Sequence, residues 1–153
     1  MPTLQDVFAK FGDAAEAAQL LETELGNLLL AATVESHGLA KTRNKVLAKR
    51  ILLDINRQTL GQLIQALTKS SPPPPELEDE LMLALTERNR LHHSFYREHN
   101  FRRNSEEGRM LMIADLNFIH ERILQAYKSV LLLSGTDITN VALLRPPTKH
   151  LPI

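Results

Sequence analysis

The 153-residue sequence contains no cysteine, and this absence removes several kinds of site. Disulfides, thiolate nucleophiles and zinc sites that depend on cysteine ligands are all excluded. Tryptophan is absent too, and aromatic residues make up only 5% of the chain, so we expect a core built mostly from leucine and alanine. No apolar run is long enough to cross a bilayer, and the first residues lack the pattern of a signal peptide. We therefore expect a cytoplasmic protein that does not contact a membrane.

The chain has no excess of charge of either sign, because 18 basic residues balance 18 acidic ones. A strong attraction to nucleic acid by bulk charge is therefore not expected. The charges are nevertheless unevenly distributed. Residues 1–40 hold one basic and six acidic residues, whereas residues 41–57 hold six basic residues and one acidic residue. This pattern indicates either helices that pair through opposite charges or a local basic patch that binds a ligand.

Hydrophobic periodicity predicts five helices and no strand. The expected helices cover residues 4–34, 40–56, 60–69, 75–99 and 104–133, with Gly12 as a candidate break in the first. Gly38 and Gly135 are expected to end helices, and Thr59 to cap the third. Four consecutive prolines, Pro72 to Pro75, forbid helix, although the last of them can begin the fourth helix. Asn104 and Glu107 have the spacing of a capping box for the fifth helix.

These elements predict an all-α fold, an up-and-down bundle of about five helices. We expect one domain over residues 1–135, followed by an extended C-terminal tail over residues 136–153, which contains prolines and shows no helical period.

The helix expected at residues 75–99 has well-separated faces when residues are placed at about 100° intervals. Its apolar stripe consists of Leu77, Leu81, Ala84, Leu85, Leu91 and Phe95. A neighbouring strip carries Met82, Asn89, His93 and Tyr96, and the far side carries Asp79, Arg90, Ser94 and Arg97. We expect this far side to be an ordinary solvated face. Arg88 falls near the middle of the apolar stripe, with His92 at its edge.

A guanidinium on a buried stripe is costly unless it is paired or opens to a wet cleft. Arg88 could therefore pair with a carboxylate of the last helix, such as Asp115 or Glu121. Alternatively, the stripe at this level faces a second subunit across a polar cleft. His93 shares a face with Asn89 and is either a hydrogen-bonded interface histidine or a proton-transfer group.

The stretch "RNRLHH", with Arg88, Asn89 and His93, resembles the R-x4-6-H motif of HEPN domains. The run "TLGQLIQAL" followed by prolines and a motif-bearing helix also resembles small bacterial HEPN-like proteins, over roughly residues 15–134. The resemblance implies a helical bundle, often a homodimer in which the motif helices meet. It also implies a metal-independent endoribonuclease of the toxin or antiphage type, with RNA or a nucleotide and an antitoxin protein as partners. Other members of the family are non-catalytic nucleotide-binding or protein-interaction scaffolds.

The resemblance also implies roles for individual residues. Arg88 would hold the scissile phosphate, His93 would act as general acid or base on the ribose 2′-hydroxyl, and Asn89 would orient one of them. His92 is the alternative to His93. The residues expected to bind RNA are His92, Tyr96, Arg97, Arg102, Arg103, Lys41, Lys45 and Lys49.

No cofactor or metal is implied by this resemblance. A zinc or iron site formed by His92, His99 and His120 is a further interpretation, because histidines of helical bundles can bind these metals.

Overall fold

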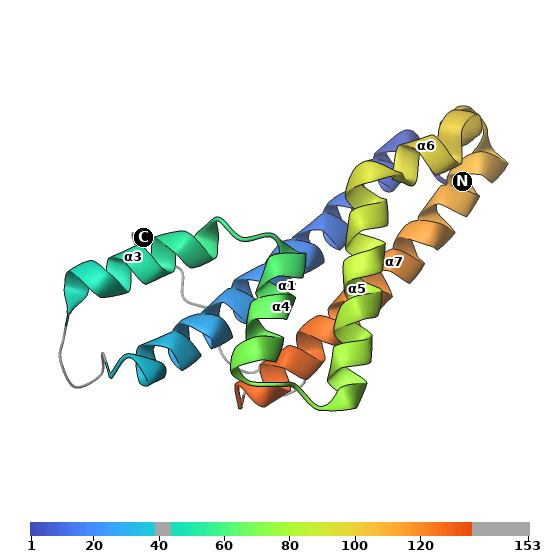
Figure 1. The fold of residues 1–153 in the computed structure, drawn as a ribbon. Helices are drawn as coiled ribbons and strands as arrows, with labels where there is room; N and C mark the ends of the chain where they lie inside the picture. The colour runs from blue at the N-terminus through green and yellow to red at the C-terminus, as the bar shows by residue number, and fades with distance from the viewer. Residues whose placement is uncertain (39–43, 136–153) are drawn as a thin grey trace, which may run out of the picture.

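The computed structural model describes residues 1–38 and 44–135, which fold into helices without any strand (Figure 1). The helices of this part are α1 (Leu4–Ser36), α3 (Lys45–Asn56), α4 (Leu60–Ser70), α5 (Pro75–His93), α6 (Phe95–His99), the 3₁₀-helix η1 (Asn100–Asn104) and α7 (Glu106–Leu133). The predicted all-α class is confirmed. Lys41 and the predicted tail at residues 136–153 lie outside the described residues.

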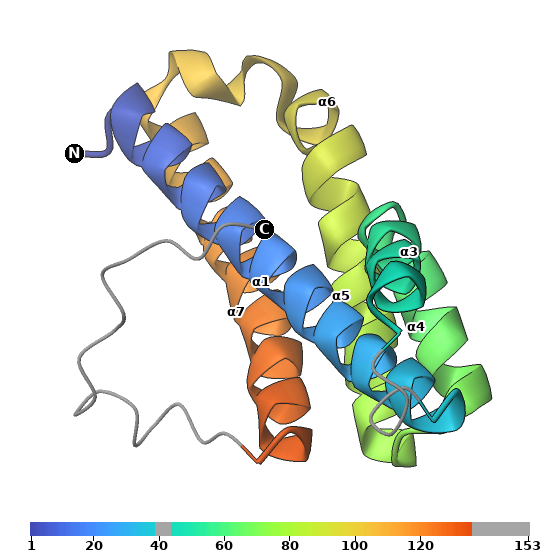
Figure 2. The same cartoon turned by 90° about the vertical axis from the view of Figure 1, so that its left-hand side faces the viewer.

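Successive long helices alternate in direction, whereas α1 and α7 lie side by side and run the same way (Figures 1 and 2). Two contacts fix this parallel register. The Arg109 guanidinium donates to the carbonyl of Pro2 at one end (2.8 Å), and the Ser134 hydroxyl donates to Glu24 near the other (2.7 Å). α5 packs against α7, α4 packs against α1, and α3 turns back along the C-terminal half of α1.

The helix expected at residues 75–99 is divided at Ser94, so six α-helices are found in the described part where five were predicted. Helical hydrogen bonds continue on both sides of the division: the Ser94 N–H donates to Arg90 and its carbonyl accepts from Glu98 (both 2.9 Å). The division therefore redirects the helix without unwinding it.

Most helix boundaries follow the expected local chemistry. Thr59 caps α4 in a capping box with Gln62, and Gly38 and Gly135 adopt positive φ angles (63° and 79°) just beyond α1 and α7. The predicted cap of α7 is wrong by one residue. The hydroxyl of Ser105 accepts the N–H of Gly108 (3.0 Å), and Asn104 belongs to η1.

The core consists mostly of leucine, isoleucine and alanine side chains from α1, α4, α5 and α7, and Phe95 of α6 is its largest fully buried side chain. The predicted apolar stripe of α5 and α6 is confirmed: Leu77, Leu81, Ala84, Leu91 and Phe95 are buried, and Leu85 is partly buried against the same core.

Two glycines of the helices have opposite surroundings. Gly108 is buried in α7 where the backbone of η1 crosses it, and a Cβ at this position would collide with the Arg102 carbonyl. Gly12 is exposed in α1, a Cβ there would meet nothing within 4 Å, and α1 continues through it unbroken.

We therefore expect Gly108→Ala to lower the free energy of unfolding by about 2 kcal/mol or more, because the backbone of η1 must move. The matched change Gly12→Ala should raise it by about 0.5–1 kcal/mol, since alanine is the better helix former. Urea denaturation of the two variants measures both effects. A Gly108→Ala variant as stable as the parent protein would show that η1 does not press on α7.

Candidate functional site

Arg88 forms an ion pair with Glu22 of α1, 66 positions earlier in the sequence. Its Nε and Nη2 donate to the same oxygen of Glu22, Oε1, at 3.1 and 3.0 Å, and its Nη1 donates to Asn89 Oδ1 at 3.2 Å. The side chains of Arg88 and Glu22 remain 21% and 26% exposed. The expected pairing of Arg88 with Asp115 or Glu121 is therefore wrong: the partner belongs to the first helix, and the pair reaches the surface.

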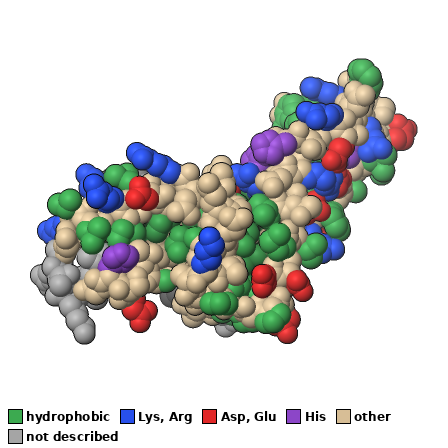
Figure 3. Space-filling model, viewed as in Figure 1, with side chains coloured by type: hydrophobic (Ala, Val, Ile, Leu, Met, Phe, Trp, Pro, Cys, Tyr) green, Lys and Arg blue, Asp and Glu red, His purple; other side chains and the backbone are tan. Residues whose placement is uncertain are grey.

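The two adjacent histidines end α5 and are exposed to solvent. Figure 3 shows histidine side chains on the surface over this end of the helix. Partial burial lowers the pKa of His92, and the nearby positive charge of Arg88 lowers it further, whereas Glu22 acts in the opposite direction. Glu22, Arg88, Asn89, His92 and His93 thus form one polar surface, which we call the motif face.

Four of the other predicted binding residues lie on α6 and η1. Tyr96 is half-exposed and packs on Phe11 and Phe95, with ring centroids 5.6 and 5.2 Å apart, and Arg97 is exposed beside it on α6. Arg102 and Arg103 are exposed on η1, although Arg102 also contacts a buried histidine, His99 (3.1 Å).

Lys45 and Lys49 are exposed on α3, whose N-terminal end lies at the opposite side of the molecule from α6 (Figure 1). Basic side chains over α3 are accordingly separate from the histidines over α5 in Figure 3. The structure therefore gathers Arg88, Asn89, His92 and His93, and it does not bring the lysines of α3 to them.

Arg90 is partly buried and paired, whereas the sequence predicted an ordinary solvated face; Asp79 and Arg97 of that face are exposed. Arg90 Nη1 and Nη2 donate to the two carboxylate oxygens of Asp115 on α7 (2.7 and 2.6 Å). Glu87 and Glu98 bind the same guanidinium at 2.9 and 3.0 Å. The prediction failed because it assumed that α5 is covered on one side only, whereas α7 covers the side that carries Arg90.

His99 completes this second cluster from α6 and is only 4% exposed. Its Nδ1 lies 3.1 Å from Arg102 Nη1, and its Nε2 lies 2.7 Å from Asp115 Oδ2. Because arginine can only donate, Nδ1 accepts and the neutral ring donates its Nε2–H to Asp115. The Arg90 guanidinium, followed by the His99 hydrogen bond, holds the pKa of Asp115 below its ordinary value, and the Asp115 contact raises the pKa of Arg90.

The sequence did not reveal the partners of three residues of these clusters: Glu22, Asp115 and His99. Glu22 carried the clearest signal. It lies four positions after Ala18 and three before Leu25, both buried, so it is a carboxylate on the core-facing side of α1. A carboxylate and an arginine that both fall on buried stripes are natural partners. Asp115 lies between buried residues in the same way, three positions after Met112 and four before Ile119, but the pattern of α5 did not indicate that Arg90 faces it.

The described residues contain no group of three or more histidine, aspartate or glutamate side chains arranged to hold a metal ion. His99 contacts Asp115 and Arg102, and His92 is exposed on a differently directed helix. His92, His99 and His120 therefore do not form the metal group considered from the sequence. Among the helices of residues 1–38 and 44–135, none combines the length and hydrophobicity needed to cross a membrane.

We expect Asp115→Asn to lower the free energy of unfolding by about 2 kcal/mol at neutral pH, because Arg90 and His99 lose a charged partner. The pKa of Asp115 is lower in the folded state than its ordinary value of 3.8, so the unfolded chain binds more protons as the pH falls. The stabilising effect of Asp115 is therefore present above about pH 4 and is lost at lower pH.

Urea denaturation of wild type and variant from pH 7 to pH 2 measures this difference, which should shrink as the pH falls. Asp13→Asn is the control, since Asp13 is an exposed partner of Lys10 (3.6 Å), and its effect should stay within about 0.5 kcal/mol. A difference that is constant over the pH range would contradict the role given to Asp115.

The pKa of His92 should report the charges of the motif face. Arg88→Gln removes a positive charge and is expected to raise this pKa, whereas Glu22→Gln removes a negative charge and should lower it. Proton NMR titration of the histidine ring signals measures both changes. If neither substitution moves the pKa of His92, its ring does not lie near the ion pair.

Comparison of the chain with protein-family models, curated proteins and solved structures finds no match, so a functional assignment depends on the geometry of this chain.

Proposed function

We propose that the protein is a HEPN-like, metal-independent endoribonuclease whose site is built from two copies of the motif face across a homodimer interface. The observation that carries this proposal is the position of Arg88, which Glu22 and Asn89 hold at the surface of α5, near the exposed His92 and five residues before the exposed His93. A cation fixed beside a solvent-facing histidine is the minimum that phosphate binding and proton transfer require.

The hydrogen bonds of Arg88 suggest how a phosphate would enter. Among the described residues, Nη1 bonds only to the neutral amide oxygen of Asn89, whereas Nε and Nη2 bond to the carboxylate of Glu22. A phosphate oxygen can replace the amide oxygen without separating the ion pair. Charge-assisted bonds are roughly twice as strong as neutral ones, so this exchange favours the phosphate.

The histidines supply the proton transfers. His93 takes the proton from a ribose 2′-hydroxyl, whose oxygen then attacks the adjacent phosphorus. The bond from phosphorus to the 5′-oxygen breaks, and that oxygen takes a proton from the histidine of the second copy. The products are a 2′,3′-cyclic phosphate and a 5′-hydroxyl. The lowered pKa of His92 makes it the alternative base, because its ring stays neutral over a wider pH range.

An enzyme of this kind would act as a toxin or antiphage effector, with an antitoxin protein as its regulator. The alternative function is a non-catalytic HEPN-like scaffold that binds a nucleotide or a protein. The Arg88–Glu22 pair favours that alternative, because an arginine neutralised within its own chain can serve structure alone.

Purified protein incubated with single-stranded RNA in EDTA tests the catalytic proposal. His93→Ala and Arg88→Ala should each slow cleavage by about 100-fold or more, since each removes a proton-transfer or phosphate-binding group. His37→Ala is the matched control, because His37 is an exposed histidine beyond the C-terminal end of α1, and cleavage should be unchanged. Wild type that cleaves no faster than His93→Ala rules out catalysis by this motif.

Mixing wild-type with His93→Ala chains tests whether the site is shared. A shared site takes one histidine from each copy, so the mixed dimer should lose nearly all activity. A mixed dimer that keeps about half of the wild-type activity would place a complete site within each chain. A stable dimer that leaves RNA intact in every variant would support the scaffold.

A further inference from the structure

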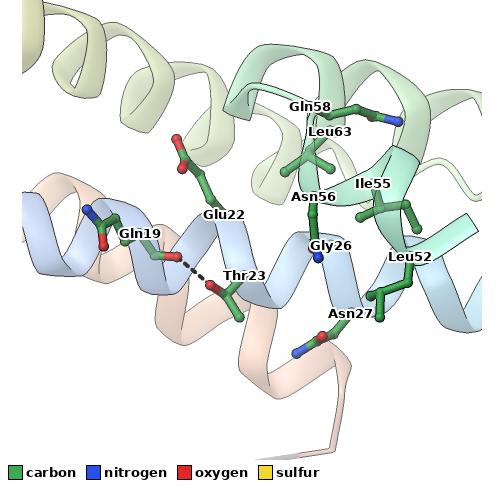
Figure 4. A pocket seen from close by; sticks show the side chains of 10 residues that line it. All are labelled: Gln19, Glu22, Thr23, Gly26, Asn27, Leu52, Ile55, Asn56, Gln58 and Leu63. Atoms are coloured by element: carbon green, nitrogen blue, oxygen red, sulfur yellow. Dashed lines mark hydrogen bonds between the residues drawn. The ribbon is translucent and has the colours of Figure 1, made fainter. Parts of the chain in front are cut away.

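A cleft of about 380 Å³ opens between α1 and the α3–α4 turn, directly beside the motif face. Figure 4 shows its lining from α1, α3 and α4. The apolar part of the lining consists of Leu52, Ile55 and Leu63. The other part carries the side-chain amides of Gln19, Asn56 and Gln58. The volume lies within the range of small-molecule sites.

The charge of the lining limits what the cleft can hold. No lysine, arginine or histidine is among the lining residues, so the cleft offers no cation to an anionic group. The amides of Gln19, Asn56 and Gln58 make no hydrogen bond to other described residues, and each can both donate and accept. An apolar wall beside free amides suits a flat, uncharged, hydrogen-bonding ring.

Glu22 connects the cleft to the motif face. It lines the cleft, and its carboxylate extends from α1 in the direction of α5, where Oε1 accepts both N–H groups of Arg88 (Figure 4). Oε2 has no partner among the described residues and can accept further N–H groups. A ligand that extends from the cleft to the motif face would meet the carboxylate of Glu22 in the cleft and the guanidinium of Arg88 at the edge of the cleft.

We propose that the cleft binds an unpaired guanine base of the RNA whose phosphate contacts Arg88. This inference rests on the proposed function. Proteins read single-stranded RNA by taking up unstacked bases and bonding to their edges. Guanine presents two adjacent donors, N1–H and N2–H, which the free oxygen Oε2 of Glu22 can accept while Oε1 stays bonded to Arg88. The side-chain amides of the cleft form hydrogen bonds with the remaining edge of the base. The ribose then places the phosphate outside the cleft, near Arg88.

Binding of the four 5′-mononucleotides, GMP, AMP, CMP and UMP, tests the inference without requiring catalysis. GMP should bind most tightly and shift the side-chain amide signals of Asn56 and Gln58 in ¹H–¹⁵N NMR spectra. Thr23→Leu fills the cleft from an exposed position of α1 and should weaken GMP binding about tenfold. Gln65→Ala is the control, because it removes an exposed amide of α4 outside the cleft and should have no effect.

Guanosine lacks the phosphate of GMP, so comparing the two ligands distinguishes binding of the base from binding of the phosphate. Arg88→Ala should weaken GMP binding and leave guanosine binding unchanged, since only GMP carries a phosphate. Thermal unfolding checks that each variant is folded, and Gln58→Ala provides a second test of the cleft if Thr23→Leu does not fold.

Unchanged GMP affinity in both cleft variants, or equal affinity for all four nucleotides, would overturn the guanine site. RNA cleavage that depends on His93 without any nucleotide binding in the cleft would overturn this inference and leave the proposed function standing. GMP binding that depends on Thr23 in a protein without RNA cleavage would keep the cleft and reject catalysis.

Discussion

The two hydrogen bonds between the Arg90 guanidinium and the Asp115 carboxylate set the rotation of α5 within the bundle. They attach one side of α5 to α7. Because an α-helix turns about 100° per residue, a position two residues away points almost to the opposite side. Arg88 is therefore directed toward α1, where Glu22 receives it. The same Asp115 carboxylate binds His99 and so fixes the direction in which the chain continues after Ser94. The motif face and the segment that follows Ser94 thus both depend on one partly buried carboxylate of α7.

The two arginines show why similar ion pairs can have different roles. Arg90 is surrounded by three carboxylates and a neighbouring histidine network, and no edge of its guanidinium is left for a ligand. Arg88 has one carboxylate partner and one neutral amide partner at the surface. Separating Arg90 from its partners would leave several partly buried charges unpaired, which is costly, whereas replacing the amide at Arg88 leaves none. The geometry therefore gives Arg90 a role in stability and leaves one N–H edge of Arg88 able to contact a ligand.

Local chemistry made much of this fold predictable. The period of the apolar residues, the capping role of Thr59 and the prolines before α5 each act within a few positions, so the helices and the buried stripe of α5 could be identified. The cap of α7 was misplaced because Asn104 and Ser105 are both good capping residues, and η1 takes the first of them. The partners of Arg88 and Arg90 could not be identified, since they depend on which helices cover α5. Arg88 and Glu22 are 66 positions apart in the sequence, and Arg90 and Asp115 are 25 apart, so tertiary packing decides which of these residues pair.

The parallel arrangement of α1 and α7 has a consequence for how the protein reaches its folded state. α1 is the first described helix and α7 the last, yet each covers much of the buried face of the other (Figure 2). During synthesis the part of the apolar side of α1 that α7 covers therefore stays exposed until residues 106–133 have left the ribosome. A newly made chain exposes such a surface to aggregation and to chaperones for that interval. Completion of the core is thus coupled to translation of its last helix, and the motif face cannot be assembled correctly before then.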